Sequence, residues 1–534
     1  MYLVLILLQL ITFILTYIIP KGLFDTIEYS SEENLFIIKI NGKKNSIIRV
    51  NATQEELDKR DISVSLDSFL KGNITRPLAI PNTYDRINEN NGNLYGFFDI
   101  FSFPMKGLID SSDICFYLFI TGGALNILDK MKIFSSGMKA LNNRFKSKFY
   151  LLIVILVLAA FGGTTFGLFE EIINIYPIIM PFFINKNNKN SDYFDGLLSM
   201  SPLFLGSICG NMFSTITPSS VVLASNIAGI DFLEGFFLRL IGLILSLFLT
   251  IWYLWIYYHL INNGEGRSFI DDDTEEKLLD KYEQDEEKKQ NDFELRLVDE
   301  KNNEEGQYLI NNYKNNNKTD EFTCIRKSAL IIFFVTIFVL IFGVFKFNWS
   351  IIQMGSVFFV FSIILIILNY NELDEVMKDF MAGAGNVFGV AIIIGMARAI
   401  TLTLNHRKVS DTILNSLLKL ADNISKKYFG LIVIIINIVL GFLIQSTSGL
   451  AVLSISPFVP LADKIDCPKS VVVNAFMFGQ AIIGLITPTG LIFLILNQIG
   501  YINYCTWFKF IFLYMFILFF LSFIIIIINT YFMK

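Results

Sequence analysis

Two small polar clusters interrupt long apolar runs near the C-terminal end of the chain, at 445–449 (QSTSG) and 487–490 (TPTG). Hydroxyl, amide and free backbone N–H groups at such interruptions can bind a carboxylate or a cation. A helix inside lipid loses backbone hydrogen bonds only where the interruption is packed in protein or lines a wet cavity. Two interruptions close together therefore indicate a binding site for a small solute.

The same pair of interruptions occurs earlier in the chain, at 162–167 (GGTTFG) and 215–220 (TITPSS). The tetrapeptide TFGL at 165–168 corresponds to TSGL at 447–450, and an Ile-Thr-Pro motif follows each of them. Because the two motifs keep their order, we interpret the chain as two related halves. Broken helices in corresponding positions of two halves are the best sequence sign of a transporter's central site.

The candidate substrate-binding residues are hydroxyl, amide and charged side chains at or beside these interruptions: Thr164, Thr165, Glu170, Asn211, Thr217, Ser219, Arg398, Gln445, Ser446, Thr447, Ser448, Gln480, Thr487 and Thr489. Opened helix N-termini at the predicted hairpin tips suit a carboxylate, and each proline frees a carbonyl one turn back. A structural interpretation stands beside this one. Gly, Ser and Thr also permit close helix packing in lipid, and proline also produces simple kinks.

Three charged residues are predicted at membrane depth, where an ionisable side chain is costly and usually functional. Glu170 and Glu171 lie in FGLFEEIINIYP. We expect at most one of them to face the site, because neighbours on a helix point about 100° apart; the alternative is a cap or an interfacial position. Arg398, the only charge in AIIIGMARAI, is interpreted either as a substrate contact or as the structural partner of one of these glutamates.

Composition places the chain in a membrane. Of 534 residues, 53% are hydrophobic and only 17% are charged, against about 25% in soluble domains, and the mean hydropathy is +0.55. Runs such as 235–261 and 508–529 exceed the roughly 20 residues that cross a bilayer. We predict an all-α polytopic membrane protein with roughly 11–13 spanning or re-entrant segments.

Other function classes find no support in the sequence. The net charge of −5 gives no basic excess for nucleic acid. The five cysteines have no metal or redox spacing, and we see no nucleophile–histidine pair or phosphate loop. We therefore predict neither an enzyme nor a metal site.

Polar segments divide the chain. The basic loop at 129–148 is predicted to be cytoplasmic, and counting spans from it places both 21–112 and 403–427 outside, although 403–427 is itself basic. The predicted organisation is a first span (1–20), an extracytoplasmic loop (21–112), a first repeat (113–263), a charged disordered linker (264–327), two connecting spans (328–373) and a second repeat (374–534). The sequons at Asn51 and Asn73 predict a glycoprotein.

Several of these motifs also occur together in a known family. PLADKI (460–465), FGQAIIGLITPTG (478–490), GMARAI (395–400) and GGTTFGLFEE (162–171) together resemble the anaerobic C4-dicarboxylate carrier-like family, in its YfcC-type branch of putative basic amino-acid antiporters. The resemblance implies an ion-transporter-superfamily fold with two inverted repeats, each containing a re-entrant hairpin and a discontinuous helix. It also implies small organic anions or amino acids as substrates, moved by a cation gradient or by exchange.

The chain departs from the family pattern at three points. Gln480 stands where relatives usually have Asp, Gly484 stands where they usually have Asn, and Thr217-Pro218-Ser219 replaces the usual Asn-Pro-Phe. Because the family's carboxylate is missing, the resemblance is weaker evidence for sodium or proton coupling in this protein. The charge that a substrate would meet also changes, so we do not assign the family's substrate to this protein.

We predict a secondary active transporter of small carboxylate-bearing metabolites that works by alternating access, with an amino acid, in particular a basic one, placed before a C4-dicarboxylate. The alternatives are an uncoupled uniporter or channel, and a transporter-derived receptor or scaffold. No cofactor is predicted, and Na⁺ or H⁺ is the expected coupling ion. Expected partners are the substrate, the lipid bilayer and, in a homodimer, a second copy of the chain, with no nucleic acid. We expect the plasma membrane rather than an internal one.

Overall fold

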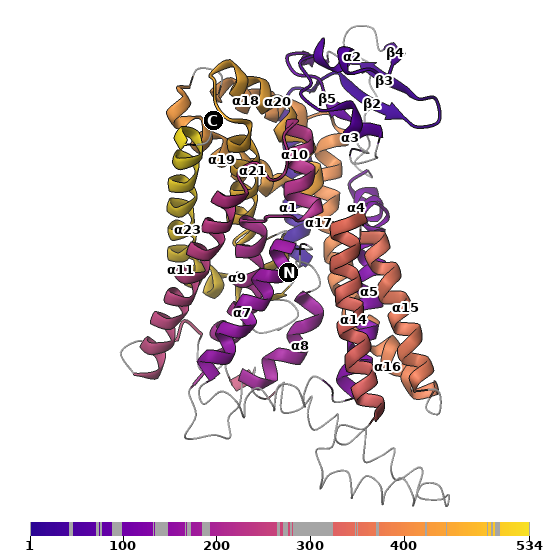
Figure 1. Ribbon diagram of the computed structural model, residues 1–534, viewed down its shortest axis with the longest axis vertical. Coiled ribbons are helices and arrows are strands. Elements are labelled where there is room, and N and C mark those ends of the chain that lie inside the picture. The colour runs from indigo at the N-terminus through magenta and orange to yellow at the C-terminus, as the bar shows by residue number, and fades with distance from the viewer. Residues whose placement is uncertain are drawn as a thin grey trace, which may run out of the picture.

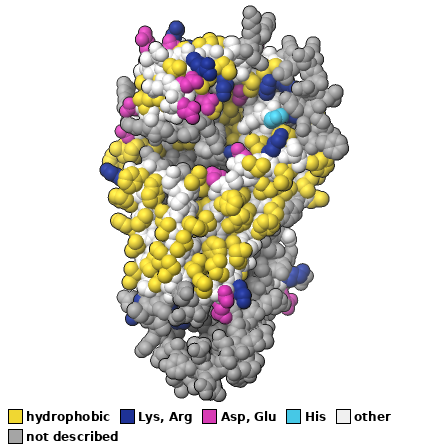
Figure 2. All heavy atoms as spheres, turned by 90° about the vertical axis from the view of Figure 1, so that its right-hand side faces the viewer, with side chains coloured by type: hydrophobic (Ala, Val, Ile, Leu, Met, Phe, Trp, Pro, Cys, Tyr) yellow, Lys and Arg dark blue, Asp and Glu magenta, His cyan; other side chains and the backbone are white. Residues whose placement is uncertain are grey.

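The structure is a computed structural model that describes residues 2–41, 46–70, 74, 77–87, 99–131, 133, 148–165, 167, 172–183, 193–263, 268–270, 276–277, 280, 324–347, 349, 351–369, 373–421, 424–444, 446–488, 490–492, 495–496 and 502–532. Its membrane part is helical (Figure 1). Seven described helices are long and apolar enough to cross a membrane, or eight if the bent pair Phe101–Asp110 and Ser112–Lys130 forms one span. Figure 2 shows a broad apolar band between charged ends, as expected for a polytopic membrane protein.

The first half contains a re-entrant hairpin. α7 (Lys148–Thr165) runs inward and α8 (Ile172–Phe183) returns to the same face of the protein. There the Lys148 ammonium donates to the Phe183 carbonyl at 3.3 Å. Thr164 and Thr165 therefore lie at the inner end of α7, where the sequence predicted a hairpin tip.

The second half contains the corresponding hairpin. α19 (Lys426–Leu443) runs inward, and α20 (Thr447–Lys464) returns to the face from which α19 started. Lys426 lies 3.7 Å from the carboxylate of Asp466, just beyond the end of α20. The predicted tip at 446–448 is the N-terminal end of α20.

Each half also contains a discontinuous helix. α9 (Gly196–Met212) stops at the first Ile-Thr-Pro motif, and the chain continues as a π-helix, η1 (Pro218–Val222), and then as α10 (Leu223–Ala228). α21 (Lys469–Gly484) stops in the same way at the second motif. One long helix follows each discontinuous helix: α11 (Phe236–Asn262) in the first half and α23 (Tyr504–Phe532) in the second.

The two halves run in opposite directions. Next to the start of α9, the backbone N–H of Tyr193 donates to Asn262 at the end of α11, at 2.9 Å. At the start of α21, the Ser470 hydroxyl donates to Asn529 near the end of α23, at 3.3 Å. α11 ends at the lower end of Figure 1, whereas α23 ends at the upper end, beside the C-terminus. These opposite directions agree with the predicted pair of inverted repeats.

Glycines bring the helices of each half into backbone contact. A Cβ on Gly210 of α9 would lie 2.3 Å from the Ala160 carbonyl oxygen of α7, and one on Gly163 would lie 2.6 Å from the Ser207 carbonyl. In the second half, a Cβ on Gly479 of α21 would lie 2.7 Å from the Ile434 carbonyl of α19. Small residues allow this approach, which strengthens dispersion contacts where lipid removes the hydrophobic drive.

The remaining membrane helices form a second unit, which we call the scaffold: α1 (Tyr2–Ile18), α4 (Asp99–Asp110), α5 (Ser112–Lys130), α14 (Cys324–Phe347), α15 (Ile351–Leu368), α16 (Leu373–Asn386) and α17 (Phe388–His406). α4 packs on α17 and α5 packs on α16. Glycines again set the distance: a Cβ on Gly107 would lie 2.1 Å from the Gly395 carbonyl, and one on Gly383 would lie 2.4 Å from that of Gly122.

Residues 22–87 contain a small β domain, which we call the β cap. The sequence predicts only a polar extracytoplasmic loop here, and the structure corrects this by showing strands. β2 (Thr26–Ser30), β3 (Leu35–Ile40), β4 (Ser46–Asn51) and β5 (Leu78–Ala79) form an antiparallel sheet in the order β4-β3-β2-β5, and β1 (Gly22–Leu23) pairs with β6 (Asp85–Arg86). α2 (Gln54–Asp58) and α3 (Leu66–Leu70) complete the domain. Its core buries Ile27, Phe36, Leu57 and Phe69.

The β cap sits on one end of the membrane part (Figure 1). The Phe24 N–H donates to Asp411 of α18 (Ser410–Ala421) at 3.0 Å, and the Ser456 hydroxyl of α20 donates to the Ala79 carbonyl at 3.0 Å. Gly229, just after α10, lies so close to the β cap that a Cβ on it would be 1.8 Å from the Ser63 carbonyl oxygen. The loop at 403–427 therefore lies at the same end as the β cap, as counting spans predicted.

The helix contact at Gly210 makes a stability prediction. Gly210→Ala should destabilise the protein by about 1–3 kcal/mol, because its methyl group would meet a backbone carbonyl. Gly385→Ala on α16 is the matched control, since a Cβ there meets nothing within 4 Å; that variant should be neutral or about 0.5–1 kcal/mol more stable. Thermal unfolding of the detergent-purified protein measures both. Equal effects of the two substitutions would contradict the packing argument.

Asp411 makes a pH prediction. Burial raises the pKa of this carboxyl to about 6, although the Phe24 N–H opposes the shift. In the unfolded chain the pKa of an aspartate is about 3.9. Between about pH 3.9 and about pH 6 the folded protein therefore binds more protons than the unfolded chain, and its stability falls as the pH rises through that window. Asp411→Asn keeps an acceptor for Phe24 without the charge. Its thermal midpoint, measured from about pH 4 to about pH 6.5, should fall less than that of the unmodified protein; parallel curves would exclude Asp411 as the cause.

Candidate functional site

In the first half, the hairpin tip and the interrupted helix are joined by threonine hydroxyls. Thr164 accepts a hydrogen bond from the Thr215 backbone N–H at 3.1 Å, and the two hydroxyls lie 3.1 Å apart. Thr217 donates to the Gly163 carbonyl at 3.0 Å. All three threonines are buried. The tip of the hairpin is therefore fixed directly to the break between α9 and η1.

The other candidates of the first half contribute less to this junction. The Thr165 hydroxyl donates to the Phe161 carbonyl of its own helix at 2.6 Å. The Asn211 amide nitrogen donates to the Ser207 carbonyl, also in its own helix, at 3.1 Å. Ser219 is the second residue of η1, and its side chain lies outside the described part of the structure, as does the whole of Glu170.

In the second half, an amide takes the place of one threonine. Gln480, on α21, donates from its side-chain nitrogen to the Thr447 hydroxyl at 2.8 Å. Ser446 caps α20 by accepting from the Gly449 N–H at 3.2 Å, and its hydroxyl lies 3.4 Å from that of Ser448. The predicted residues Ser446, Thr447, Ser448 and Gln480 thus come together, while Gln445 and Thr489 lie outside the described residues.

Carbonyl groups freed at the second break are bound by α23. The Trp507 indole N–H donates to the Leu485 carbonyl at 2.9 Å, and the Tyr504 hydroxyl donates to the Ile486 carbonyl. Neither aromatic residue is predicted from the sequence. Thr487 follows Ile486 in the chain, precedes Pro488 and is buried. These two carbonyls are therefore engaged by protein donors.

The two junctions lie against each other near the middle of the protein. Phe213, directly after α9, packs on Phe478 of α21 with ring centroids 4.9 Å apart. η1 contacts both α20 and α21. The site region is therefore built from both halves, with broken helices of opposite direction meeting at one depth.

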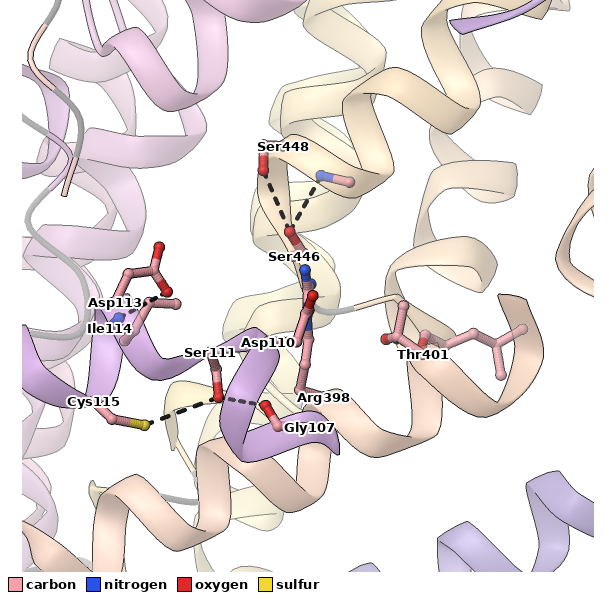
Figure 3. A network of polar contacts seen from close by, with 12 residues as sticks. Gly107, Asp110, Ser111, Asp113, Ile114, Cys115, Arg398, Thr401, Ser446 and Ser448 are labelled. Carbon is pink, nitrogen blue, oxygen red and sulfur yellow. Dashed lines mark hydrogen bonds and ion pairs between the residues drawn. The ribbon is translucent and has the colours of Figure 1, made fainter. Parts of the chain in front are cut away.

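A charged pair from the scaffold faces the second tip. Arg398 of α17 forms an ion pair with Asp110, the last residue of α4. One turn further along α17, the Thr401 hydroxyl donates to the Leu443 carbonyl at 3.2 Å, at the end of α19. Figure 3 shows the Arg398 side chain extending toward Ser446. Arg398 is thus placed where a substrate at this tip would meet it.

Among the described residues, the partner of Arg398 is Asp110, and the predicted pairing with Glu170 or Glu171 stays a prediction. Glu170 and Glu171 lie outside the described residues, and the arginine pairs with Asp110. Asp110 was missed because it falls inside the segment assigned to an extracytoplasmic loop. Its helix forms a bent pair with α5, at an angle of 62°, and Pro104 lies inside α4. The sequence signal for this span is Pro104 in a moderately apolar run that continues into the more apolar run of α5.

The described residues offer little to a tightly held metal ion. No group of three or more His, Cys, Asp or Glu side chains among them lies close enough together to hold one. Among the described residues, the groups gathered at the two tips are hydroxyls, one amide, one guanidinium and one carboxylate. Such a set is suited to a small organic solute carrying charged groups.

Comparison with known proteins places this architecture in a family. Residues 1–531 match the sequence model of the family described as DcuC, C4-dicarboxylate anaerobic carrier. The chain belongs to this family. It is therefore a membrane transporter of the carrier type, and its match extends over both repeats, the scaffold and the β cap.

Relatives of this carrier occur in bacteria. It is 32% identical over 498 residues to an uncharacterized protein of Haemophilus influenzae, covering 93% of this chain and 90% of that one. It is 23% identical over 428 residues to the putative basic amino acid antiporter YfcC of Escherichia coli, covering 77% of each.

Solved structures of transporters are also similar to the carrier. MtrF of Neisseria gonorrhoeae, described within a class of antimetabolite efflux pumps, aligns over 99% of this chain and 95% of its own, with 11% identity and a TM-score of 0.40. The YdaH transporter of Alcanivorax borkumensis aligns over 98% and 97%, with 10% identity and a TM-score of 0.38.

The carrier's first junction makes a prediction. Thr164→Val should cost about 1–3 kcal/mol, because it removes the acceptor of the buried Thr215 N–H without changing side-chain volume. Thr336→Val is the control, because the buried Thr336 hydroxyl donates to the Ile332 carbonyl of its own helix, at 2.8 Å. Thermal unfolding in detergent should separate the two variants. A control that loses as much stability would show that the effect is not specific to the junction.

Proposed function

We propose that the protein is a secondary active transporter of small carboxylate-bearing metabolites, working by alternating access between its two faces. One observation carries this proposal: the Arg398 guanidinium extends toward the opened N-terminal end of α20 (Figure 3). A guanidinium and a helix N-terminus both favour an anion, and they approach the same place from the scaffold and from the hairpin. A carboxylate held there would contact both units.

Amino acids are proposed before C4-dicarboxylates. The Escherichia coli relative is named as a putative basic amino acid antiporter, whereas the family is named for dicarboxylates. The presence of Asp110 beside Arg398 supports the first class, because a second carboxylate on the substrate would meet a like charge. The proposed site residues are Arg398, Ser446, Thr447, Ser448 and Gln480, with Thr164 and Thr217 holding the opposite junction.

Coupling to Na⁺ or H⁺, or exchange of one solute for another, is proposed to drive transport. Gln480 is neutral and donates to Thr447, so the usual family carboxylate does not supply a proton site at this position. We place the carrier in the plasma membrane with the β cap outside. The sequon at Asn51 lies at the exposed end of β4, as glycosylation there would require.

Uptake by proteoliposomes tests this function. Purified protein would be given labelled arginine, ornithine, aspartate and malate, with and without sodium and proton gradients. We expect uptake of at least one of them, and we expect Thr447→Ala with Ser448→Ala to reduce it roughly 10-fold or more, because a hydrogen bond to a charged group contributes about 1.5–3 kcal/mol.

Thr336→Ala is the matched control, because it also removes a buried hydroxyl but lies on α14. Uptake unchanged by the double substitution would exclude the second hairpin tip as the binding site. Absence of uptake of all four compounds by folded protein would favour the alternative function, in which the protein is a transporter-derived receptor or an assembly platform for other proteins. Uptake that no gradient stimulates would indicate a uniporter.

A further inference from the structure

The ion pair between Arg398 and Asp110 has a feature that a purely structural pair does not need. It joins two scaffold helices that glycines already hold in backbone contact, at Gly107 and Gly395. Its side chains are not sealed off: 18% of the Arg398 side chain and 40% of the Asp110 side chain are exposed. We propose that this pair is the recognition element for an α-amino acid, whose carboxylate binds Arg398 and whose ammonium group binds Asp110. The inference rests on the proposed function and deepens it.

The position of Asp110 supports this role. It ends α4 at the 62° bend, where α5 begins in a new direction. Ser111 at the bend donates its hydroxyl back to the Gly107 carbonyl at 2.7 Å, which fixes the last turn of α4 and therefore the carboxylate at its end. In Figure 3, Asp110, Arg398 and Ser446 lie in one column, with Asp110 beside the arginine and Ser446 beyond it.

The chemistry of the pair predicts selectivity. An isolated charge is costly in a membrane protein, so Arg398 and Asp110 neutralise each other when no substrate is bound. A zwitterion supplies one charge for each and can open the pair without leaving either unpaired. A dicarboxylate can bind Arg398 but leaves Asp110 unpaired beside a second negative charge. The pair therefore selects for an α-ammonium group by penalising its absence.

Two pairs of compounds test this selectivity, because each differs only in the α-ammonium group: aspartate and succinate, and ornithine and 5-aminopentanoate. The concentration of each compound that halves uptake of the transported amino acid would be measured in proteoliposomes. In the unmodified protein we expect the amino acid of a pair to compete roughly 10- to 100-fold better than its partner. Asp110→Asn should bring this ratio close to one by weakening only the amino acid.

Asp113→Asn is the matched control. Asp113 lies at the same bend and carries the same charge, but its described contact is with the Ile114 N–H, at 2.9 Å, and not with Arg398. This variant should keep the selectivity ratio. If it lowers the ratio as much as Asp110→Asn does, the general charge of the bend is responsible and the inference is overturned.

A charge-swapped variant, Asp110→Arg with Arg398→Asp, separates recognition from a structural role and also serves if Asp110→Asn fails to fold. It restores an ion pair between the same helices but exchanges the positions of the charges. We expect folded protein with a ratio near one. Normal uptake with the original ratio would overturn the inference.

Transport by the unmodified protein distinguishes failure of this inference from failure of the proposed carrier function. Uptake of succinate or malate with no preference for an amino acid would overturn this inference and leave the proposed carrier function in place. Failure to take up or bind any of these compounds would overturn both.

Discussion

Backbone groups freed by an interrupted helix need hydrogen-bond partners inside the membrane, and this requirement governs the centre of the protein. At the first interruption, Thr164 accepts from a freed N–H and Thr217 donates to a carbonyl of the neighbouring hairpin. At the second, Trp507 and Tyr504 bind two freed carbonyls. Each interruption is thus stabilised by a neighbouring segment, and the hairpin tips are held in place without any contribution from a solute.

The two halves share this architecture, and the described contacts between scaffold and hairpin differ between them. In the first half, the scaffold meets the hairpin through neutral groups, since Asn174 of α8 donates to the Thr121 hydroxyl of α5 at 2.8 Å. In the second half, the scaffold presents Arg398 with Asp110. An inverted repeat supplies two similar frameworks, and among the described residues the scaffold of the second half contributes a charged pair to its framework.

Sequence alone predicted the features that depend on neighbouring residues. Gly, Thr, Ser and Pro inside apolar runs mark where a helix cannot continue, so both hairpin tips and both interrupted helices were located, and their repeated order predicted the inverted halves. Partners distant in sequence left no such sign. Trp507 and Tyr504 look like ordinary members of an apolar helix, and Asp110 is 288 residues from Arg398. The strands of the β cap were missed because they are short and lie in a segment rich in charges and turn-forming residues.

The β cap contacts parts of the protein that the proposed alternating access would have to move. It holds α18 through Asp411, the returning arm of the second hairpin through Ser456, and the end of α10 through the close approach at Gly229. A domain outside the membrane helices is thus attached to segments from both repeats, and a change in their relative position must strain or release one of these contacts. A binder that recognises one arrangement of this domain would shift the carrier toward the matching state by its difference in affinity. The transport cycle could then be controlled by a molecule that never enters the membrane.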